Sequence, residues 1–172
     1  MSVTVVVSPT KLTWNDFLPV STLPDSSGDD AQTATTMSPL SAIQPVLAQG
    51  RFSLPNLTLT VGLDSSQTLV VSTARKTADL LKHEQGHFDI TVLTVRALAR
   101  ELEQIKADSI PALGRHVGAA VSKHQQRANM IEDKYDKETK NSRDQDAQKN
   151  WNQLIDAAMK GSGVTILQGL PL

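Results

Sequence analysis

A long apolar periodicity, from Thr73 to about Ala107, constrains the fold more than any other feature of the chain. Its apolar residues recur at steps of three and four, as one face of an α-helix requires. They are Leu80, Leu81, Phe88, Val92, Val95, Leu98, Leu102 and Ile105. No proline interrupts the stretch before Pro111. The sequence therefore predicts a long helix here, stopped by Ser109 or Pro111.

Two further helices are expected after this one. The second runs from Ala112 to about Lys140, and the third runs from Asp144 to Lys160, with Asp144 as N-cap and Gly161 as the stop. The tail, residues 161–172, contains Gly and Pro and is expected either to form a final strand or to lack regular structure.

The first 73 residues differ in composition, because they hold six of the eight prolines and are rich in Ser, Thr and Val. Their β-branched or alternating runs predict strands at 3–7, 52–54, 57–61 and 68–72. The last two are expected to form a hairpin. The polar stretch 21–44 is interpreted mostly as loop, with an edge strand around 33–36. The sequence thus predicts an α+β fold in a single domain, 1–172. It comprises a β-rich part (1–73), a helical part (74–160) and a tail (161–172).

Composition excludes several function classes. The chain has 17 basic and 18 acidic residues, so it lacks the positive field that nucleic-acid binding needs. It has no cysteine, which excludes disulfides and thiolate metal sites. No segment is apolar for long enough to span a bilayer. The opening residues lack the basic and apolar regions of a signal peptide, which leaves a cytoplasmic location open.

An H-E-x-x-H motif, His83-Glu84-Gln85-Gly86-His87, lies inside the predicted long helix. Residues four apart share one helix face, so two imidazoles there can hold one Zn²⁺. Glu84 would then accept a proton from an attacking water as general base. The competing interpretation is a structural helix in which this motif is a coincidence. Gly86 has a cost of about 1 kcal/mol relative to Ala inside a helix, which close approach by substrate or another backbone would explain.

Three blocks of sequence resemble a bacterial family of predicted secreted zinc-dependent proteases. The first surrounds the motif, from Leu80 to Thr91, and reads Leu-Leu-Lys-His-Glu-Gln-Gly-His-Phe-Asp-Ile-Thr. The second is Leu12-Thr13-Trp14-Asn15-Asp16-Phe17, near the start. The third comprises Tyr135-Asp136-Lys137-Glu138-Thr139 and Gln148-Lys149-Asn150-Trp151. The resemblance implies a zincin-like metallopeptidase, secreted or periplasmic, that acts on peptide or protein substrates. Its N-terminal β-rich layer would pack on the active-site helix.

The sequence departs from that family at one position. Where the family has a histidine suited to be the third zinc ligand, this chain has Asn141, a poor ligand. Asp136 is our first candidate for the third ligand, ahead of Asn141 itself. The remaining candidates are Glu101, His116 and His124, although Glu101 lies about 21 Å along the same helix from His87.

Other residues have two interpretations each. Tyr135 is a candidate to hydrogen-bond an oxyanion near the metal, or is a structural phenol. Asp89 could orient a ligand, or be an exposed charge. We expect Trp14, Phe17 and Trp151 to be buried anchors, since the chain has only six aromatic residues.

The sequence therefore predicts a zinc-dependent metallopeptidase in which His83, His87 and Asp136 hold Zn²⁺. Glu84 and Tyr135 are its candidate catalytic residues. The alternative is a degenerate relative with a weakened metal site that acts as a binding or scaffold module.

Overall fold

The computed structural model describes residues 3–24, 29–38, 44–161 and 163–172, which form a mixed α+β fold. A strand-rich region precedes a long helix, and two more helices follow, so the predicted fold class is confirmed. The helices are α1 (Ala78–Gln104), α2 (Ile110–Thr139) and α3 (Gln145–Lys160), with a 3-10 turn η1 (Trp14–Asp16). The strands are β1 (Val3–Ser8), β2 (Leu18–Val20), β3 (Ala31–Gln32), β4 (Thr35–Met37), β5 (Val46–Ala48), β6 (Arg51–Ser53), β7 (Leu57–Leu63), β8 (Leu69–Val71), β9 (Ile166–Leu167) and β10 (Leu170–Pro171).

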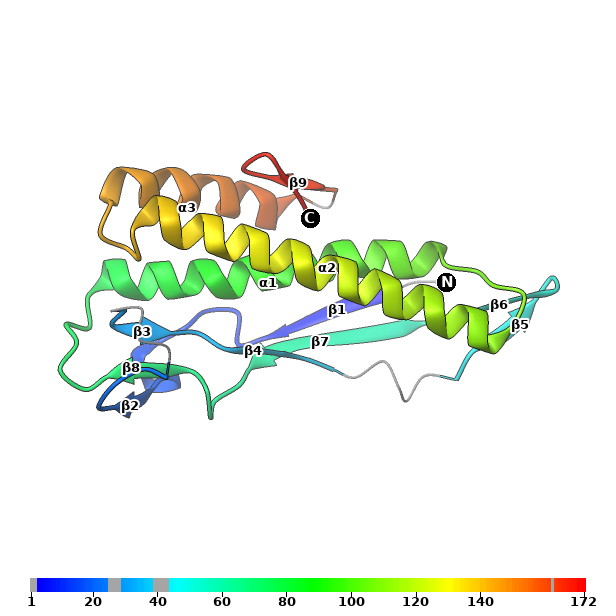
Figure 1. The fold of residues 1–172 in the computed structure, drawn as a ribbon, viewed down its shortest axis with the longest axis horizontal. Helices are drawn as coiled ribbons and strands as arrows, with labels where there is room; N and C mark the ends of the chain where they lie inside the picture. The colour runs from blue at the N-terminus through cyan, green and yellow to red at the C-terminus, as the bar shows by residue number, and fades with distance from the viewer. Residues whose placement is uncertain (1–2, 25–28, 39–43, 162) are drawn as a thin grey trace.

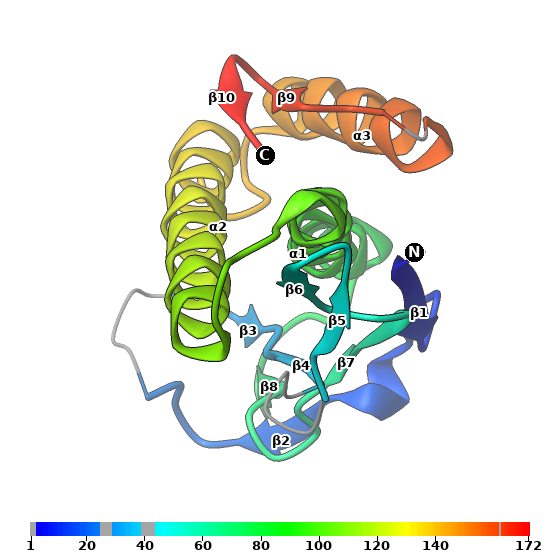
Figure 2. The ribbon, with the colours of Figure 1, turned by 90° about the vertical axis from the view of Figure 1, so that its right-hand side faces the viewer.

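Helix α1 lies at the centre of the molecule. The main sheet packs on one side of it, and α2 and α3 pack on the other sides (Figure 1; Figure 2). The helix begins later than predicted, because the side chain of Thr77 accepts a hydrogen bond from the Leu80 amide and caps it. Packing on several sides of α1 holds this helix in place. His83 and His87 of the H-E-x-x-H motif lie on this helix and are therefore held in place with it.

Two small three-stranded sheets and the antiparallel pair of β5 and β6 make up the described part of the strand-rich region. One sheet has the order β1-β7-β4 and the other the order β2-β8-β3. The predicted hairpin of 57–61 with 68–72 is wrong, because β7 pairs in parallel with β1 and β8 pairs in parallel with β2. Between β7 and β8 the chain turns at Asp64, whose carbonyl accepts the amides of Gln67 and Thr68 at 3.1 and 2.8 Å. This turn sends the two strands into different sheets.

Residues 31–37, here named the edge segment, continue along both sheets. Strand β3 pairs antiparallel with β8, and β4 pairs antiparallel with β7. Both strands are last in their sheets, so one border of the edge segment has no strand partner among the described residues. The edge strand predicted around 33–36 therefore exists, in two short pieces joined at Thr33 and Ala34.

The second and third helices match their predicted positions closely. The side chains of Ser109 and Asp144 cap α2 and α3. Between these helices, Lys140, Asn141 and Ser142 all have positive φ, at 50°, 54° and 69°. This left-handed turn reverses the chain. The tail forms the antiparallel pair β9–β10.

Two hydrophobic clusters meet on α1. The first lies between the sheet and α1 and includes Leu59, Val61 and Phe17. The second lies between the helices and the tail and includes Trp151, which is 1% exposed. Trp14 is only partly buried at the border of the first cluster, so the prediction of full burial is wrong for it. Its ring packs at 5.1 Å from that of Phe17, which is the more deeply buried of the two.

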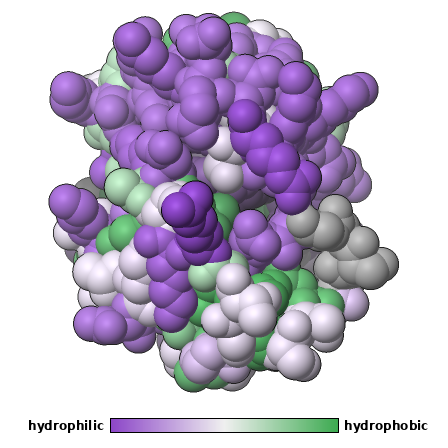
Figure 3. Space-filling model, turned by 90° about the vertical axis from the view of Figure 1, so that its left-hand side faces the viewer, coloured by the Kyte–Doolittle hydropathy of each residue, from purple (hydrophilic) through white to green (hydrophobic). Residues whose placement is uncertain are grey.

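The surface polarity follows the two layers. At the end of the molecule shown in Figure 3, hydrophilic residues cover the helical half above, and paler, less polar residues cover the strand-rich half below. Within the part of the chain that the structure describes, no helix combines the length and apolarity needed to cross a membrane.

Candidate metal centre

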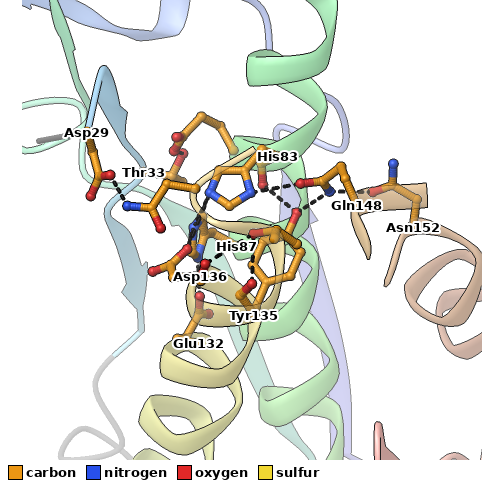
Figure 4. A network of polar contacts seen from close by, with 12 residues as sticks. Asp29, Thr33, His83, His87, Glu132, Tyr135, Asp136, Gln148 and Asn152 are labelled. Carbon is orange, nitrogen blue, oxygen red and sulfur yellow. Dashed lines mark hydrogen bonds and ion pairs between the residues drawn. The ribbon is translucent and has the colours of Figure 1, made fainter. Parts of the chain in front are cut away.

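His83, His87 and Asp136 form one cluster of potential ligands, here named the metal cluster (Figure 4). The two histidines lie one turn apart on α1, and Asp136 reaches them from α2. The two Nε2 atoms are 3.2 Å apart. Oδ1 of Asp136 lies 3.3 Å from Nε2 of His83 and 3.0 Å from Nε2 of His87.

The spacing of these three atoms fits a metal ion. Ligands at about 2.0–2.1 Å from a tetrahedral zinc are separated from one another by about 3.3 Å. The measured separations of 3.0–3.3 Å match that value. In addition, Oδ1 of Asp136 is buried and has no hydrogen-bond donor among the described residues. A buried acceptor without a donor is rare in native structures, and a cation at this position would satisfy it.

A second set of side chains fixes which nitrogen of each histidine faces the cluster. Nδ1 of His83 lies 3.0 Å from Oε1 of Gln148, and Nδ1 of His87 is in short contact with Oε2 of Glu132. Both partners are acceptors, so each Nδ1 donates, and in a neutral ring each Nε2 keeps a lone pair. This is how ligating histidines are commonly oriented in metal sites.

The charges of the cluster shift its pKa values. Burial lowers the pKa of His87, but the carboxylates of Glu132 and Asp136 raise it more, and the net pKa lies well above the usual 6.5. Burial alone would raise the pKa of Asp136. Its contacts with His83 and His87 outweigh that effect, and the net pKa lies below the usual range of an aspartate. Burial also raises the pKa of Glu132, against the opposing effect of His87. The two carboxylates thus stabilise positive charge at Nε2 of His87, which either a proton or a bound cation would supply.

Tyr135 lies beneath the metal cluster, outside the open part of the site. Its ring stacks on that of His83 at 4.7 Å, and its side chain is completely buried. The hydroxyl donates to the carbonyl of His83 at 3.1 Å and accepts from Nε2 of Gln148 at 2.7 Å. Because both of these bonds are internal, the predicted oxyanion role for Tyr135 does not fit the structure. Tyr135 instead supports His83.

The same tyrosine explains the glycine of the motif. A Cβ added to Gly86 would lie 2.2 Å from the hydroxyl oxygen of Tyr135 and 2.6 Å from its Cζ. Only glycine leaves room for the phenol against α1. The sequence analysis expected substrate or another backbone to approach Gly86 closely. The group that does so is instead the side chain of Tyr135, from α2.

Glu84 lies beside the metal cluster and is 2% exposed. Its Oε2 accepts a hydrogen bond of 2.8 Å from the hydroxyl of Thr33, in the edge segment. Glu84 and the metal cluster line one cleft of about 390 Å³, together with residues of the edge segment and α2. We name it the metal cleft. A carboxylate held in this way beside potential metal ligands can exchange a proton with a small molecule in the cleft.

Asn141 lines the metal cleft but does not join the metal cluster. Its amide donates to Oδ1 of Asp29, across the cleft mouth. The cluster of three donor atoms is complete without it, so the place where the chain departs from the family pattern does not remove the third candidate ligand.

The other candidates lie elsewhere. His116 is exposed on α2. His124 pairs with Glu101, at 2.9 Å between Nε2 and Oε2, outside the metal cleft. Asp89 is buried and accepts from Gln85 at 2.8 Å, so it does not orient either histidine of the motif.

The sequence analysis missed two residues of the site, Glu132 and Gln148. Glu132 lies four residues before Asp136 and therefore on the same face of α2. This spacing could have indicated that Glu132 lies beside Asp136 at the site. Gln148 was noted only within a block of resemblance, and nothing in its spacing indicates a contact with His83.

Comparison with protein families gives one match. Residues 45–145, more than half of the chain, match the family described as "Bacterial protein of unknown function (DUF922)". No curated protein and no solved structure matches the chain. The matched region contains the motif on α1 and the whole of α2, including Asp136. The chain therefore belongs to this bacterial family of unknown function.

Proposed function

We propose that the protein is a zinc-dependent peptidase whose ion is held by His83, His87 and Asp136. The observation that carries the proposal is the metal cluster itself, in which three donor atoms lie 3.0–3.3 Å apart beside a buried glutamate. Two imidazoles and one carboxylate are a ligand set that catalytic zinc uses, with one position left open. When bound, zinc supplies Lewis acidity and makes water a nucleophile at neutral pH.

The side chains around the cluster then have distinct roles. Glu84 takes a proton from the attacking water and passes it to the leaving amine. Its Oε1 receives no hydrogen bond from the described residues, while Thr33 holds Oε2 and so orients the carboxylate. Glu132 and Gln148 keep the two imidazoles in the required tautomer.

The edge segment supports a peptide as the substrate. Its residues Ala31, Gln32 and Thr33 line the metal cleft, and one of its borders has no strand partner among the described residues. An extended peptide can add to such a border through main-chain hydrogen bonds. This mode of binding would place a peptide bond next to Glu84.

The replacement Glu84→Gln tests the proposal. The amide keeps the size of the side chain and can still accept from Thr33, but it cannot take a proton. We expect zinc content and thermal midpoint close to the wild-type values. Hydrolysis of a fluorogenic peptide library should fall by at least about a hundredfold, the range typical of a lost general base.

Glu103→Gln provides the matched control. Glu103 lies near the end of α1 and accepts from the amide of Val3, away from the metal cleft. Its replacement should leave hydrolysis unchanged. If zinc-loaded wild-type protein hydrolyses no peptide, or if Glu84→Gln hydrolyses as fast as wild type, the proposed role is wrong. The first result would favour a binding module that retains the metal.

A further inference from the structure

A second cavity lies beside the same three elements as the metal cleft, with its own set of lining residues. This cavity has a volume of about 130 Å³ and lies between α1, α2 and β4. We name it the threonine chamber. On α1 it begins at Thr91, one turn beyond His87, and on α2 it begins at Ala128, one turn before Glu132. Figure 1 and Figure 2 show β4 beneath α1 and beside α2, in line with β3.

The lining of the chamber combines hydroxyl groups with apolar walls. Thr35 and Thr91 meet in its wall, where their hydroxyls share a hydrogen bond of 3.4 Å between the Oγ1 atoms. Met37, Val95 and Leu98 provide apolar surface. The lining contains no Asp, Glu, Lys or Arg, and His124 is its one titratable residue. The chamber is therefore suited to a small uncharged group with both polar and apolar parts.

His124 lines the chamber, and its ring carries a buried acceptor that has no donor among the described residues. Its ring is 3% exposed, and Nε2 bonds Oε2 of Glu101, which also pairs with Lys123. Since Glu101 is an acceptor, Nε2 carries the proton and Nδ1 keeps a lone pair. Nδ1 is buried and has no hydrogen-bond partner among the described residues. Burial lowers the pKa of His124 despite the opposing effect of Glu101, which agrees with a neutral ring.

We propose that the threonine chamber is a specificity subsite that takes a serine or threonine side chain of the peptide substrate. The hydroxyl would donate to Nδ1 of His124 and exchange hydrogen bonds with Thr35 and Thr91, and the methyl group of a threonine would contact the apolar wall. A cavity of this volume holds the equivalent of about four water molecules, at roughly 30 Å³ each. A charged or aromatic side chain does not fit that description.

The position of this residue follows from helix geometry. The chamber spans Thr91 to Leu98 on α1, which lie four and eleven residues beyond His87. At 1.5 Å per residue this is about 6 to 16 Å along the helix. An extended peptide covers about 3.3 Å per residue, so the preferred side chain lies about two to five residues from the cleaved bond. This inference rests on the proposed function for its substrate class.

Binding can be tested without hydrolysis. A displayed library of random peptides of about twelve residues is selected on zinc-loaded Glu84→Gln protein, and on the same protein carrying His124→Leu as well. We expect one position of the enriched peptides to favour Ser and Thr on the first protein only. For an enriched synthetic peptide, changing that Thr to Val should weaken binding about tenfold in titration calorimetry, the value of one hydrogen bond to a buried group.

Thr91→Val and Thr94→Val form a matched pair of further variants. Both threonines line the chamber, but the hydroxyl of Thr94 donates to the carbonyl of Ile90 within α1. Thr91→Val should reduce the preference for Thr over Val, and Thr94→Val should reduce it less, because the Thr94 hydroxyl already donates its proton within α1. Thr91→Val also decides the question if His124→Leu does not fold.

Several outcomes would overturn the subsite. The first is that the selection enriches no peptide, and the second is that no position of the enriched peptides favours Ser or Thr. The third is that both His124→Leu and Thr91→Val retain the preference. Cleavage of the enriched peptides by wild-type protein is measured separately. Selective binding without zinc-dependent cleavage would refute the peptidase and leave the chamber as a recognition site.

Discussion

At the scale of single residues, the metal cluster depends on side chains that are not themselves candidate ligands. His83 has a neutral amide partner in Gln148, and His87 has a carboxylate partner in Glu132. The carboxylate makes the His87 imidazole the stronger electron donor of the two. The two histidines of the motif are thus held by unequal partners on two different helices, α2 and α3.

Glu132→Ala should weaken zinc binding by about 10- to 100-fold, the usual effect of removing such a partner. The imidazole of His87 loses the acceptor that fixes its Nδ1 proton. Asp133→Ala, at an exposed neighbouring position, is the control and should bind zinc as wild type does. Competition with a chelating dye measures both affinities. Equal affinities would show that Glu132 does not position His87.

Gly86→Ala should destabilise the protein by about 1–3 kcal/mol, because the new Cβ overlaps the buried ring of Tyr135. Gly118→Ala in α2 has no atom within 4 Å of its added Cβ. That control should stabilise the protein by about 0.5–1 kcal/mol through helix propensity. Urea unfolding of both variants gives the comparison. A Gly86→Ala variant as stable as Gly118→Ala would mean that Tyr135 can move away freely.

Sequence reasoning identified the part of the site that is local. The spacing of His83, Glu84 and His87 defines one face of a helix, whatever surrounds it. Asp136 was found through resemblance, since its contact with α1 joins residues about fifty apart. Gln148 could not be predicted, because its position depends on how α3 packs, and packing leaves no signal in spacing. The burial of Tyr135 against His83 depends on the packing of α2, so spacing could not decide between its two interpretations.

At the scale of elements, local signals located the three helices within a few residues. Their apolar periodicity and their caps at Ser109 and Asp144 are encoded within each helix. Strand pairing is not local, and the predicted hairpin of 57–61 with 68–72 failed on that point. Both strands found parallel partners near the start of the chain, β1 and β2, which no turn signal indicates.

The burial of His124 between α1 and α2 should make the free energy of unfolding depend on pH. Burial lowers the pKa of folded His124, so the unfolded chain binds a proton more readily than the folded chain. The stability that the neutral, buried His124 contributes is fully present above the ordinary histidine pKa of about 6.5. It is lost as the pH falls from there through the lower pKa of the folded state. From pH 7.5 to 5.5, wild type should therefore lose more stability than His124→Gln. Urea unfolding at both values measures this difference. A parallel loss in the two proteins would contradict it.

At the scale of the whole molecule, α1 joins two hydrophobic clusters. One lies against the sheet, and the other lies against α2, α3 and the tail. The metal cluster sits where α1 and α2 meet, with the edge segment closing the cleft. The metal cleft is thus built from both the helical and the strand-rich halves, and its shape depends on how these halves pack together.

The two tryptophans should differ in their contribution to stability. Trp151 is 1% exposed, and its Nε1 donates to Glu138 at 2.8 Å. Trp151→Ala should cost about 3–5 kcal/mol, as for a fully buried aromatic residue. Trp14 is only partly buried, so Trp14→Ala should cost clearly less. Thermal unfolding of both variants checks the order, and an equal or reversed order would contradict the cluster assignment.

The most direct test of the metal centre is a zinc titration of four proteins: wild type, Asp136→Ala, Asp133→Ala and Asn141→His. We expect wild type to bind one zinc ion per chain. Asp136→Ala should lose at least about tenfold in affinity with the loss of one ligand, about 1.4 kcal/mol or more. Asp133→Ala and Asn141→His should both remain close to wild type. Stoichiometric zinc that Asp136→Ala holds as tightly as wild type, or no zinc in wild type, would contradict the assignment of His83, His87 and Asp136 as the metal site.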